Sequence, residues 1–480
     1  MTYLSVILVY LFALIAIGIV KSRKIHTQSD FALAGRTLTP WILVGTMLAS
    51  WIGTGSILGN AGKTYETGMA ALMLPIGSIL GIILLTRIAG KVRSYEKYTV
   101  PEIIGDRYGP VARNLSVFAL VMAYMVIVSY QYNAGGAVLY TVLADNTGTS
   151  IISIELATII AAVFIIAYTM LAGLLSVAYT DAANSIIMTL ALVISLPILW
   201  IKAGSWSGME TAFAAMNKSQ HMQFGGVYST MDIINFCLPP FLLVIGDANM
   251  YQRFSASKDV QSARYSTTIL VFAVLFIELL IIGSAWVSSS MIPEAEVGKH
   301  VLIYAAHQFL PTFLGAIMLT TIVGIIISTA DSFLLVPANT LIRDIYLNYI
   351  NPQASEKNIV RLSRLLVLLL GIIAYIVSIG FSRSAGFFER ALYAYTIYGA
   401  AITPALVAAL FWRGATKEGA VASIICGTLI TLFWKELPGL WFWLPTKWYI
   451  SLDEVLPAIS GSLLALIGVS YLTQKADPGK

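Results

Sequence analysis

The stretch from Gly324 to Leu335 reads G-I-I-I-S-T-A-D-S-F-L-L and is an apolar helical segment interrupted by polar side chains. Ser328, Thr329, Asp331 and Ser332 supply four oxygen-bearing groups within five residues. A carboxylate at the centre of a bilayer costs about 2.5–3.5 kcal/mol, so it usually faces a cavity, a partner or an ion. Because hydroxyl and carboxylate oxygens can replace the hydration shell of a small cation, the stretch predicts a Na⁺ site. For the hydroxyls alone, bonding back to their own helix and close helix packing is an equal alternative, and Asp331 favours the ion site.

The composition is that of a polytopic helical membrane protein. Of 480 residues, 58% are hydrophobic and 11% are charged, whereas soluble domains carry about a quarter charged residues. The first apolar run, 3–20, lacks a basic stretch before it and a small-residue cleavage site after it, so we expect an uncleaved helix. Cys237 and Cys426 lie in apolar segments and indicate neither a disulfide nor a metal site.

Thirteen apolar segments are long enough to be membrane spans. With the N-terminus outside and the C-terminus cytoplasmic, 21 of the 29 Lys and Arg residues fall on the cytoplasmic side, which the positive-inside rule favours. The predicted spans are 2–20, 38–60, 68–90, 112–142, 151–172, 178–201, 229–253, 266–290, 312–342, 360–380, 386–412, 418–435 and 451–473.

Two spans contain runs of small and polar residues that predict broken helices. The second span carries residues 49–56 (A-S-W-I-G-T-G-S), and the seventh carries 246–249 (G-D-A-N) after two prolines. Because the breaks are five spans apart, the two helices enter the membrane from opposite sides, which indicates an inverted repeat with a substrate site at the breaks. The expected division is an N-terminal accessory helix and cytoplasmic loop (1–37), a first repeat (38–201), an extracellular connection (202–228), a second repeat (229–412) and two C-terminal accessory helices (413–480).

Few ionisable residues lie within the predicted spans. Asp181 opens the sixth span after the turn 173–180, and it is either a functional carboxylate or a helix N-cap. Asp247 lies at the seventh-span break, and for Glu278 in the eighth span we expect a structural hydrogen bond. No Lys or Arg is expected at mid-span, so a substrate carboxylate would rely on helix termini, backbone amides or bound Na⁺.

Four motifs follow one another along the chain at the second, fifth-to-sixth, seventh and ninth predicted spans. They are Trp51-Ile52-Gly53-Thr54-Gly55 with Gly59 and Tyr65-Glu66-Thr67-Gly68; residues 167–181 (A-Y-T-M-L-A-G-L-L-S-V-A-Y-T-D); Tyr251-Gln252-Arg253; and Ser328-Thr329-Ala330-Asp331-Ser332 followed by Arg343-Asp344-Ile345-Tyr346. Together they resemble the sodium:solute symporter family, which includes sodium/glucose, proline, sialic acid and choline transporters. The resemblance covers nearly the whole chain. It implies the inverted five-helix repeat of the bacterial leucine transporter, in agreement with the positions of the breaks.

The resemblance also implies where sodium binds. A first site between the second and ninth spans maps onto the carbonyls of Ala49, Ile52 and Ile325 and the side chains of Ser328 and Thr329. Some members have a second site, which maps onto Asp181, Ser328, Asp331 and Ser332. Both carboxylates are present, so we expect two sodium ions, each contributing about 2.3 kcal/mol per 100 mV of membrane potential.

The substrate is less well defined by the sequence. Residues 51–53 and 176–181 are most similar to the choline-type branch, which uses an aromatic cage, but Asp247 stands close to where that branch has a Trp. Asp247 could pair with a substrate amine or be held by Asn249 without meeting substrate. The candidate lining residues are Thr54, Ser56, Gln131, Asn133, Asp247 and Asn249, with Tyr393 and Tyr398 closing the site.

The expected function is Na⁺-coupled import of a small polar organic solute by alternating access. The alternatives are a proton-coupled carrier, an uncoupled facilitator or channel of the same fold, and a sensor-type membrane module. No catalytic nucleophile and base pair or phosphate loop is found, so an enzyme is not expected. The expected partners are the solute, Na⁺ as coupling ion with no other cofactor, and the lipid bilayer, but no nucleic acid. We expect a monomer or weak oligomer in the plasma membrane, most simply a bacterial inner membrane.

Overall fold

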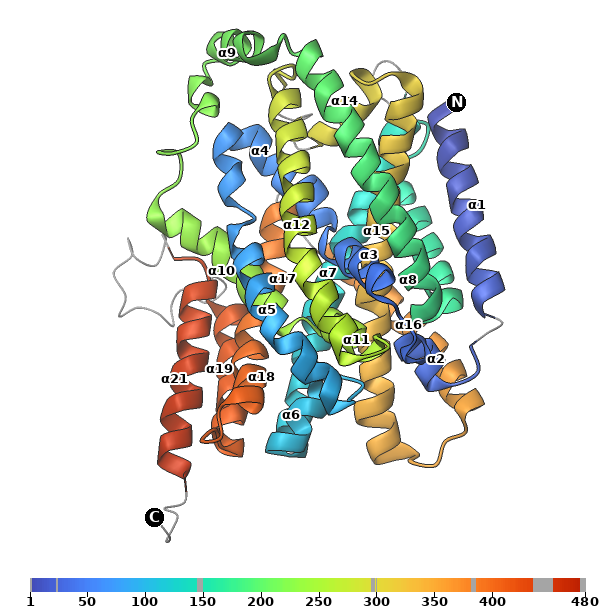
Figure 1. Cartoon of the computed structure of the whole chain (residues 1–480), viewed down its shortest axis with the longest axis vertical. Helices are drawn as coiled ribbons and strands as arrows, with labels where there is room; N and C mark the ends of the chain where they lie inside the picture. Colours follow the sequence, from blue (N-terminus) through green and yellow to red (C-terminus); the bar gives the residue numbers. More distant parts are fainter. Residues whose placement is uncertain are drawn as a thin grey trace.

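The computed structural model of the chain is a bundle of helices (Figure 1). It describes residues 2–22, 25–144, 150–294, 298, 300–380, 386–434 and 452–474. The helices are α1 (Thr2–Ser22), α2 (Gln28–Leu33), η1 (Ala34–Arg36), α3 (Pro40–Trp51), η2 (Gly55–Asn60), α4 (Ala61–Thr67), η3 (Gly68–Met73), α5 (Ile76–Tyr95), α6 (Val100–Tyr108), α7 (Pro110–Val142), α8 (Ile154–Lys202), α9 (Ser205–Ala215), η4 (Ser219–Met222), α10 (Thr230–Gly246), α11 (Ala248–Ala256), α12 (Val260–Ser289), α14 (Val301–Gln308), α15 (Thr312–Thr340), η5 (Leu341–Ile350), α16 (Glu356–Gly380), α17 (Phe387–Ala401), α18 (Thr403–Phe411), α19 (Lys417–Phe433) and α21 (Val455–Thr473).

The helices have the lengths and composition of membrane spans. Among the described residues, nine helices are long and apolar enough to cross a membrane, and α3 with the segment Gly55–Met73 makes a tenth span bent by 51°. Helix α8 contains the predicted span 178–201 and all of the predicted span 151–172 except its first three residues. The predicted ends at 435 and 451 lie outside the described residues. The all-helical membrane fold is confirmed, whereas the count of thirteen spans, the inverted repeat and the domain boundaries remain predictions.

The chain reverses direction within α8 at a single glycine. Gly173 has φ +59° and ψ 171°, which is left-handed backbone that residues with a Cβ rarely adopt. The hydroxyls of Tyr168 and Thr180 lie 3.2 Å apart, although residues twelve apart in a straight helix are separated by about 18 Å. The two halves therefore fold back on each other. The turn is tighter than the predicted loop 173–180, because helical geometry resumes directly after the glycine.

Both predicted helix breaks are confirmed. Helix α3 ends at Trp51, and Ile52 takes a ψ of 85° instead of the helical value near −42°. Helix α10 ends at Gly246, and Asp247 has φ −58° and ψ 113° before α11 begins. A hydrogen bond of 3.1 Å joins α3 to α11, from Arg253 Nε to the Thr46 hydroxyl. The two broken spans therefore meet inside the bundle.

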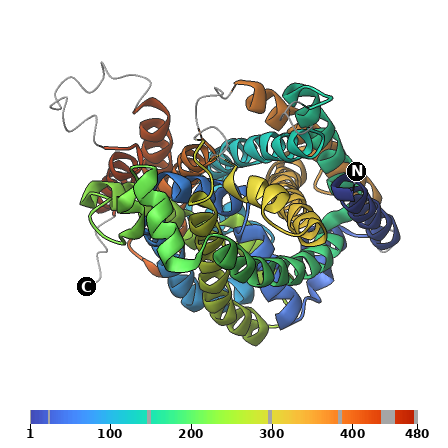
Figure 2. The same ribbon diagram turned by 90° about the horizontal axis from the view of Figure 1, so that it is seen from above.

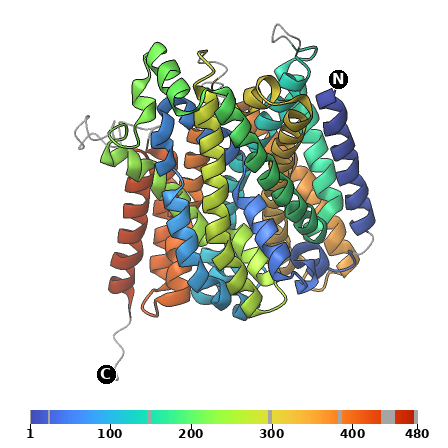
Figure 3. The ribbon, with the colours of Figure 1, turned by 45° about the horizontal axis from the view of Figure 1, so that its top comes forward.

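The breaks lie near the central helix α15. Nearly every residue from Gly315 to Thr340 is buried, the polar ones included, so α15 is surrounded by other helices on all sides. Helix α1 lies at one edge of the bundle and α21 at the opposite edge in two perpendicular views (Figures 1 and 2). Helix α1 begins at the end of the molecule where α9 and α14 lie, and α21 ends at the end where α2 and α6 lie (Figures 1 and 3). This arrangement requires an odd number of crossings.

Candidate sodium and substrate sites

The first predicted sodium site lies where the broken end of α3 meets α15. The Thr329 hydroxyl donates a hydrogen bond of 3.4 Å to the carbonyl of Ala49. The chains approach closely because Gly53 has no side chain: a Cβ there would lie 2.9 Å from Thr329 Oγ1. The ψ of Ile52 turns its carbonyl away from the direction of the helical hydrogen bonds. The break therefore presents the Ala49 carbonyl to α15, and Ile325 and Ser328 lie one turn and one residue before Thr329 on that helix.

Asp181 is the centre of a buried polar cluster between α8, α3 and α15. The Ser328 hydroxyl donates to Asp181 Oδ1 at 2.5 Å, and the Thr46 hydroxyl donates to Oδ2 at 2.6 Å. Asp181 lies eight residues beyond the reversal at Gly173, inside the second half of α8. The N-cap alternative for this residue is wrong, because its side chain bonds to other helices and the helix begins earlier than the sequence indicates.

Arg253 is the cationic member of this cluster. Its side chain is fully buried, and its Nη2 lies 3.5 Å from Asp181 Oδ2 and donates to the Ser332 hydroxyl at 2.7 Å. It also donates to the Thr46 hydroxyl and, at 3.2 Å, to the Asn249 carbonyl. No Lys or Arg is expected at mid-span from the sequence, and Arg253 stands at the very end of the predicted span 229–253, yet the structure buries it completely. The break in the seventh span directs Arg253 into the core, whereas a hydropathy profile would place this residue at a membrane surface.

Asp331 lies close to this cluster on α15. It is buried, and the Thr169 hydroxyl of α8 donates to its Oδ1. Ser328 and Asp331 are three residues apart and so lie on one face of the helix, and the Ser332 hydroxyl is 3.3 Å from that of Ser50. The four predicted ligands of the second site, on α8 and α15, therefore contact side chains of α3, α8 and α11. With two carboxylates and one guanidinium, the cluster carries a net charge of −1 when all three groups are ionised.

The backbone carbonyls at the second break accept hydrogen bonds from tyrosine hydroxyl groups. The Tyr398 hydroxyl donates to the Gly246 carbonyl at 2.8 Å, and the Tyr251 hydroxyl donates to the Ile245 carbonyl at 3.0 Å. Asp247 Oδ1 accepts from the Tyr124 hydroxyl at 2.5 Å and from the Asn249 backbone N–H at 3.1 Å. In this conformation the Asp247 carboxylate is thus held by Tyr124 and Asn249, which agrees with the alternative in which Asn249 holds it and it does not meet the substrate.

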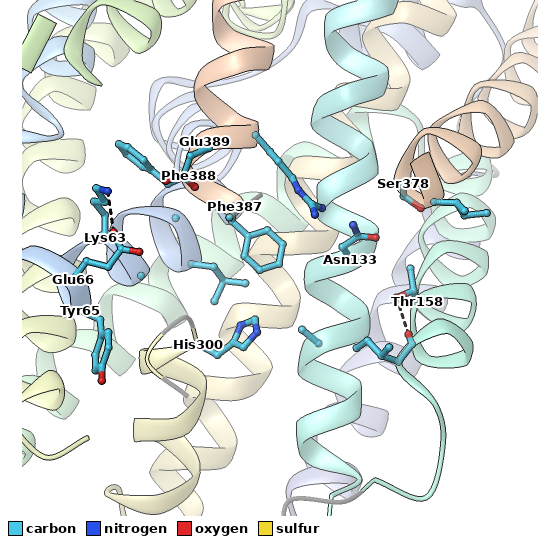
Figure 4. Close-up of a pocket in the computed structure, with 18 of the residues that line it drawn as sticks. Lys63, Tyr65, Glu66, Asn133, Thr158, His300, Ser378, Phe387, Phe388 and Glu389 are labelled. Atoms are coloured by element: carbon cyan, nitrogen blue, oxygen red, sulfur yellow. Dashed lines mark hydrogen bonds and ion pairs between the residues drawn. The ribbon is translucent and has the colours of Figure 1, made fainter. Parts of the chain in front are cut away.

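The remaining predicted lining residues fall into two places. The Thr54 hydroxyl of the first break donates to Gln131 Oε1, and both side chains are fully buried. Asn133, two residues further along α7, lines a large cavity at the end of the molecule near α14 (Figure 4). Tyr393 lines neither of the two cavities described below, whereas Tyr395, two residues further along α17, lines the smaller one.

The large cavity near α14 has a volume of about 620 Å³ and is lined by polar, aromatic and aliphatic side chains. Lys63 and Glu66 form an ion pair of 2.8 Å on one wall, with Phe387 and Phe388 beside them and Asn133 across the cavity (Figure 4). This volume is in the range of small-molecule sites.

A smaller cavity of about 40 Å³ lies beside the first break. Ser56 donates to Glu278 Oε1 at 2.6 Å, and the Asn60 amide donates to Oε2 at 3.0 Å. Phe388 lines both cavities. The lining residues are Trp51, Gly55, Ser56, Asn60, Leu74, Pro75, Ser78, Phe236, Pro240, Glu278, Phe388, Ala391, Leu392 and Tyr395.

Sequence reasoning did not assign Trp51, Asn60, Glu278, Phe388 or Tyr395 to a site. The hydrogen-bond expectation for Glu278 is confirmed, and a carboxylate within an apolar span was the one available signal for this cavity. Asn60 lies one helical turn beyond Ser56, so spacing could have placed the two together. The aromatic residues are common in apolar segments and gave no local signal.

Comparisons with known proteins agree on one class of protein. The sequence model of the sodium:solute symporter family matches residues 31–427. A sodium/proline symporter of Haemophilus influenzae is 26% identical over 98% of this chain and 94% of its own length. An osmoregulated proline transporter of Bacillus subtilis is 25% identical, with 97% and 94% covered.

Solved structures with the same fold include two transporters. The substrate-bound outward-open state of a Na⁺-coupled sialic acid symporter superposes with a TM-score of 0.81 at 15% identity, covering 98% of both chains. A closed nucleobase-cation-symport-1 family transporter gives a TM-score of 0.56 at 12% identity, covering 92% of this chain and 94% of that one. At these identities the likeness concerns the fold.

Proposed function

The chain belongs to the sodium:solute symporter family, and from this we propose that it imports a small polar organic solute together with Na⁺ by alternating access. Na⁺-coupled solute symport and a multi-pass membrane location are the common properties of this family and its relatives, which are transporters and not enzymes. The named relatives act on proline and sialic acid, which supports a small organic solute for this chain.

The junction of α3 with α15 is the observation that carries the proposal. The break in α3 leaves the Ala49 carbonyl to the Thr329 hydroxyl, and the site is built from neutral oxygens on two separate helices. Such ligands suit a weakly bound alkali cation that must also be released. Because the ligands come from two helices, Na⁺ binds most tightly when α3 and α15 are in contact. Sodium therefore shifts the population toward that arrangement, and separation of the helices releases it.

We propose that the cavity near α14 opens to the outside and that the other end is closed in this conformation. At the opposite end, Thr99 donates to Asp344 Oδ2 at 2.6 Å, and Arg113 Nε lies 3.7 Å from Asp344 Oδ1. These contacts tie α6 and α7 to η5, which continues α15, through the buried carboxylate of Asp344. An outer cavity above a closed inner end supports an outward-facing arrangement, with the N-terminus outside and the C-terminus cytoplasmic.

We further propose two sodium ions per cycle, one at the neutral first site and one at the acidic cluster. The net charge of −1 on Asp181, Asp331 and Arg253 is what one monovalent cation neutralises. Buried charge without compensation is strongly unfavourable, so this cluster favours a cation. The neutral first site has no such requirement and depends on coordination alone.

The proposal is tested by ligand-dependent stability of the purified protein. Amines, amino acids, carboxylates and sugars are screened in Na⁺ and again in K⁺, and solutes that stabilise only in Na⁺ are then tested for uptake into proteoliposomes against a gradient. By linkage, a ligand present at 100 times its Kd stabilises the folded state by about 2.7 kcal/mol. Equal stabilisation in both salts, with uptake driven by a pH gradient or by none, would favour a proton-coupled carrier or a facilitator instead.

A further inference from the structure

We infer that Glu278 is the counter-ion of a positively charged nitrogen on the transported solute, which makes the solute an amine or an amino acid. The inference rests on the proposed function and assigns a substrate class to it. It locates the recognition of that nitrogen in the cavity beside the first break, on α12, and not at Asp247.

Glu278 is a buried carboxylate whose hydrogen-bond partners are neutral. Its side chain is 1% exposed, and its two oxygens accept from the hydroxyl of Ser56 and the amide of Asn60. Among the described residues no Lys, Arg or His forms an ion pair with it, whereas Asp181 has Arg253 at 3.5 Å and Asp344 has Arg113 at 3.7 Å. Two hydrogen bonds hold the carboxylate in place but do not neutralise it. A buried carboxylate in this position is stabilised most by a cation that arrives from outside the chain.

The cavity at Glu278 has the size and walls that suit a cationic head group. A space of about 40 Å³ exceeds what one water molecule needs and is far smaller than a whole organic solute. The rings of Trp51 and Tyr395 stack with centroids 6.4 Å apart and line the same cavity. Aromatic faces attract cations, most strongly when water is excluded. A carboxylate and aromatic rings around one small cavity favour an ammonium group over a carboxylate or a sugar.

An ammonium group of the protein lies beside two aromatic rings that line this cavity. Phe388 lines both cavities, and the Lys63 ammonium lies 5.9 Å from the centre of its ring and 5.6 Å from that of Phe236. The start of α17 packs closely against η2 because Gly59 has no side chain: a Cβ there would lie 3.2 Å from Phe388 Cα. We place the solute nitrogen at Glu278 and the rest of the solute toward Phe388, which must move to admit it.

Asp247 does not compete for this role in the observed arrangement. It lines neither cavity, and its Oδ1 is engaged by the Tyr124 hydroxyl and by the N–H that begins α11. Its carboxylate therefore completes the hydrogen bonds of a helix terminus.

The test uses pairs of probes that differ in one group. L-proline is compared with cyclopentanecarboxylate, and pyrrolidine with cyclopentanol, by thermal stability of the full-length protein in Na⁺ and in K⁺. We expect Na⁺-dependent stabilisation by L-proline or pyrrolidine and none by the partner that lacks nitrogen. Each probe is used at about 10 mM, which is ten times a Kd of about 1 mM. The inference would be overturned if neither nitrogen-bearing probe stabilised the protein at this concentration. It would also be overturned if either nitrogen-free partner stabilised the protein as much as its nitrogen-bearing counterpart.

Glu278→Gln retains the shape of the side chain and removes its charge. We expect the affinity for the nitrogen-bearing probe to fall about thirtyfold or more, while stabilisation by Na⁺ alone is retained and shows that the variant is folded. The matched control is Glu418→Gln, which removes a surface carboxylate that pairs with Lys417 at 3.5 Å and lines neither cavity, and it should change probe affinity little.

The failures of the two proposals are distinguishable. Unchanged probe affinity in Glu278→Gln, or loss of its response to Na⁺ itself, would overturn the assignment of Glu278 to the substrate. If a sugar or a simple carboxylate is bound in a Na⁺-dependent manner, the proposed function stands and the inference fails. If Na⁺ has no effect on wild-type protein or on any ligand, the proposed function fails.

Discussion

Replacing Arg253 with Met should destabilise the protein strongly, because it leaves Asp181 buried without its cation. The guanidinium donates to Thr46, Ser332 and the Asn249 carbonyl and lies 3.5 Å from Asp181. Removing one partner of a buried ion pair typically costs about 3–5 kcal/mol. Asp181 keeps two hydroxyl donors, so we expect the loss in the free energy of unfolding near the lower end, about 3 kcal/mol.

The double variant Asp181→Asn/Arg253→Met separates charge from packing. It removes both members of the ion pair, so the cost of an unpaired buried charge disappears and we expect recovery of about 2 kcal/mol relative to Arg253→Met. The measurement is reversible unfolding in mixed detergent micelles, in Na⁺ and in K⁺. In the single variant, Asp181 and Asp331 give the cluster a charge of −2, so Na⁺ should stabilise it more than wild type. A double variant as unstable as the single one, with no larger effect of Na⁺, would refute the role given to the guanidinium.

Three further outcomes are expected. Thr329→Val should raise the Na⁺ concentration needed for ligand binding about tenfold, because one hydroxyl ligand is lost. Thr321→Val on the same helix, whose hydroxyl has no hydrogen-bond partner, should leave this concentration unchanged. If both variants changed it equally in a Na⁺ titration, the assignment of the first site would be refuted. Gly173→Ala should lower the free energy of unfolding by about 1–2 kcal/mol because φ is +59°, while Gly468→Ala, in open space, serves as control. Burial, and secondly the nearby Lys218, lower the pKa of His221 to about 4, so the unfolded chain takes up a proton near pH 6.5 that the folded chain does not. Stability should therefore be complete above pH 6.5 and fall as the pH decreases toward 4, and a His221→Phe variant that follows the same pH profile in unfolding experiments would contradict this.

The features that could be predicted from the sequence are those with local signals. Small and polar residues within apolar segments located both breaks, at Ala49–Ser56 and at Gly246–Asn249, and the spacing of oxygen-bearing side chains located the polar face of α15. These signals are strong because membrane helices otherwise avoid such groups. The turn at Gly173 was assigned eight residues, since sequence does not reveal that one left-handed residue suffices.

The features that could not be predicted depend on the rotation of helices and on partners far apart in the chain. Arg253 donates to Thr46, 207 residues away, and this contact exists only because the break at Asp247 redirects α11 into the core. Tyr393 and Tyr395 differ by about 200° around α17, and only the packed structure shows which one lines the cavity. Composition is the same on both sides of such a helix, so hydropathy cannot choose between them.

The position of the two proposed sites on one broken helix gives a physical basis for coupling. Ala49, whose carbonyl meets Thr329, and Ser56, which holds Glu278, are separated by only seven residues that include the bend. An ion that holds the end of α3 against α15 therefore also determines the position of Ser56, on η2, relative to the cavity. If Na⁺ raises the affinity for the solute by this route, the solute must raise the affinity for Na⁺ by the same factor, because the coupling free energy is shared. Loss of the Thr329 hydroxyl should therefore weaken the mutual dependence of Na⁺ and solute, although Thr329 lines neither of the two cavities described.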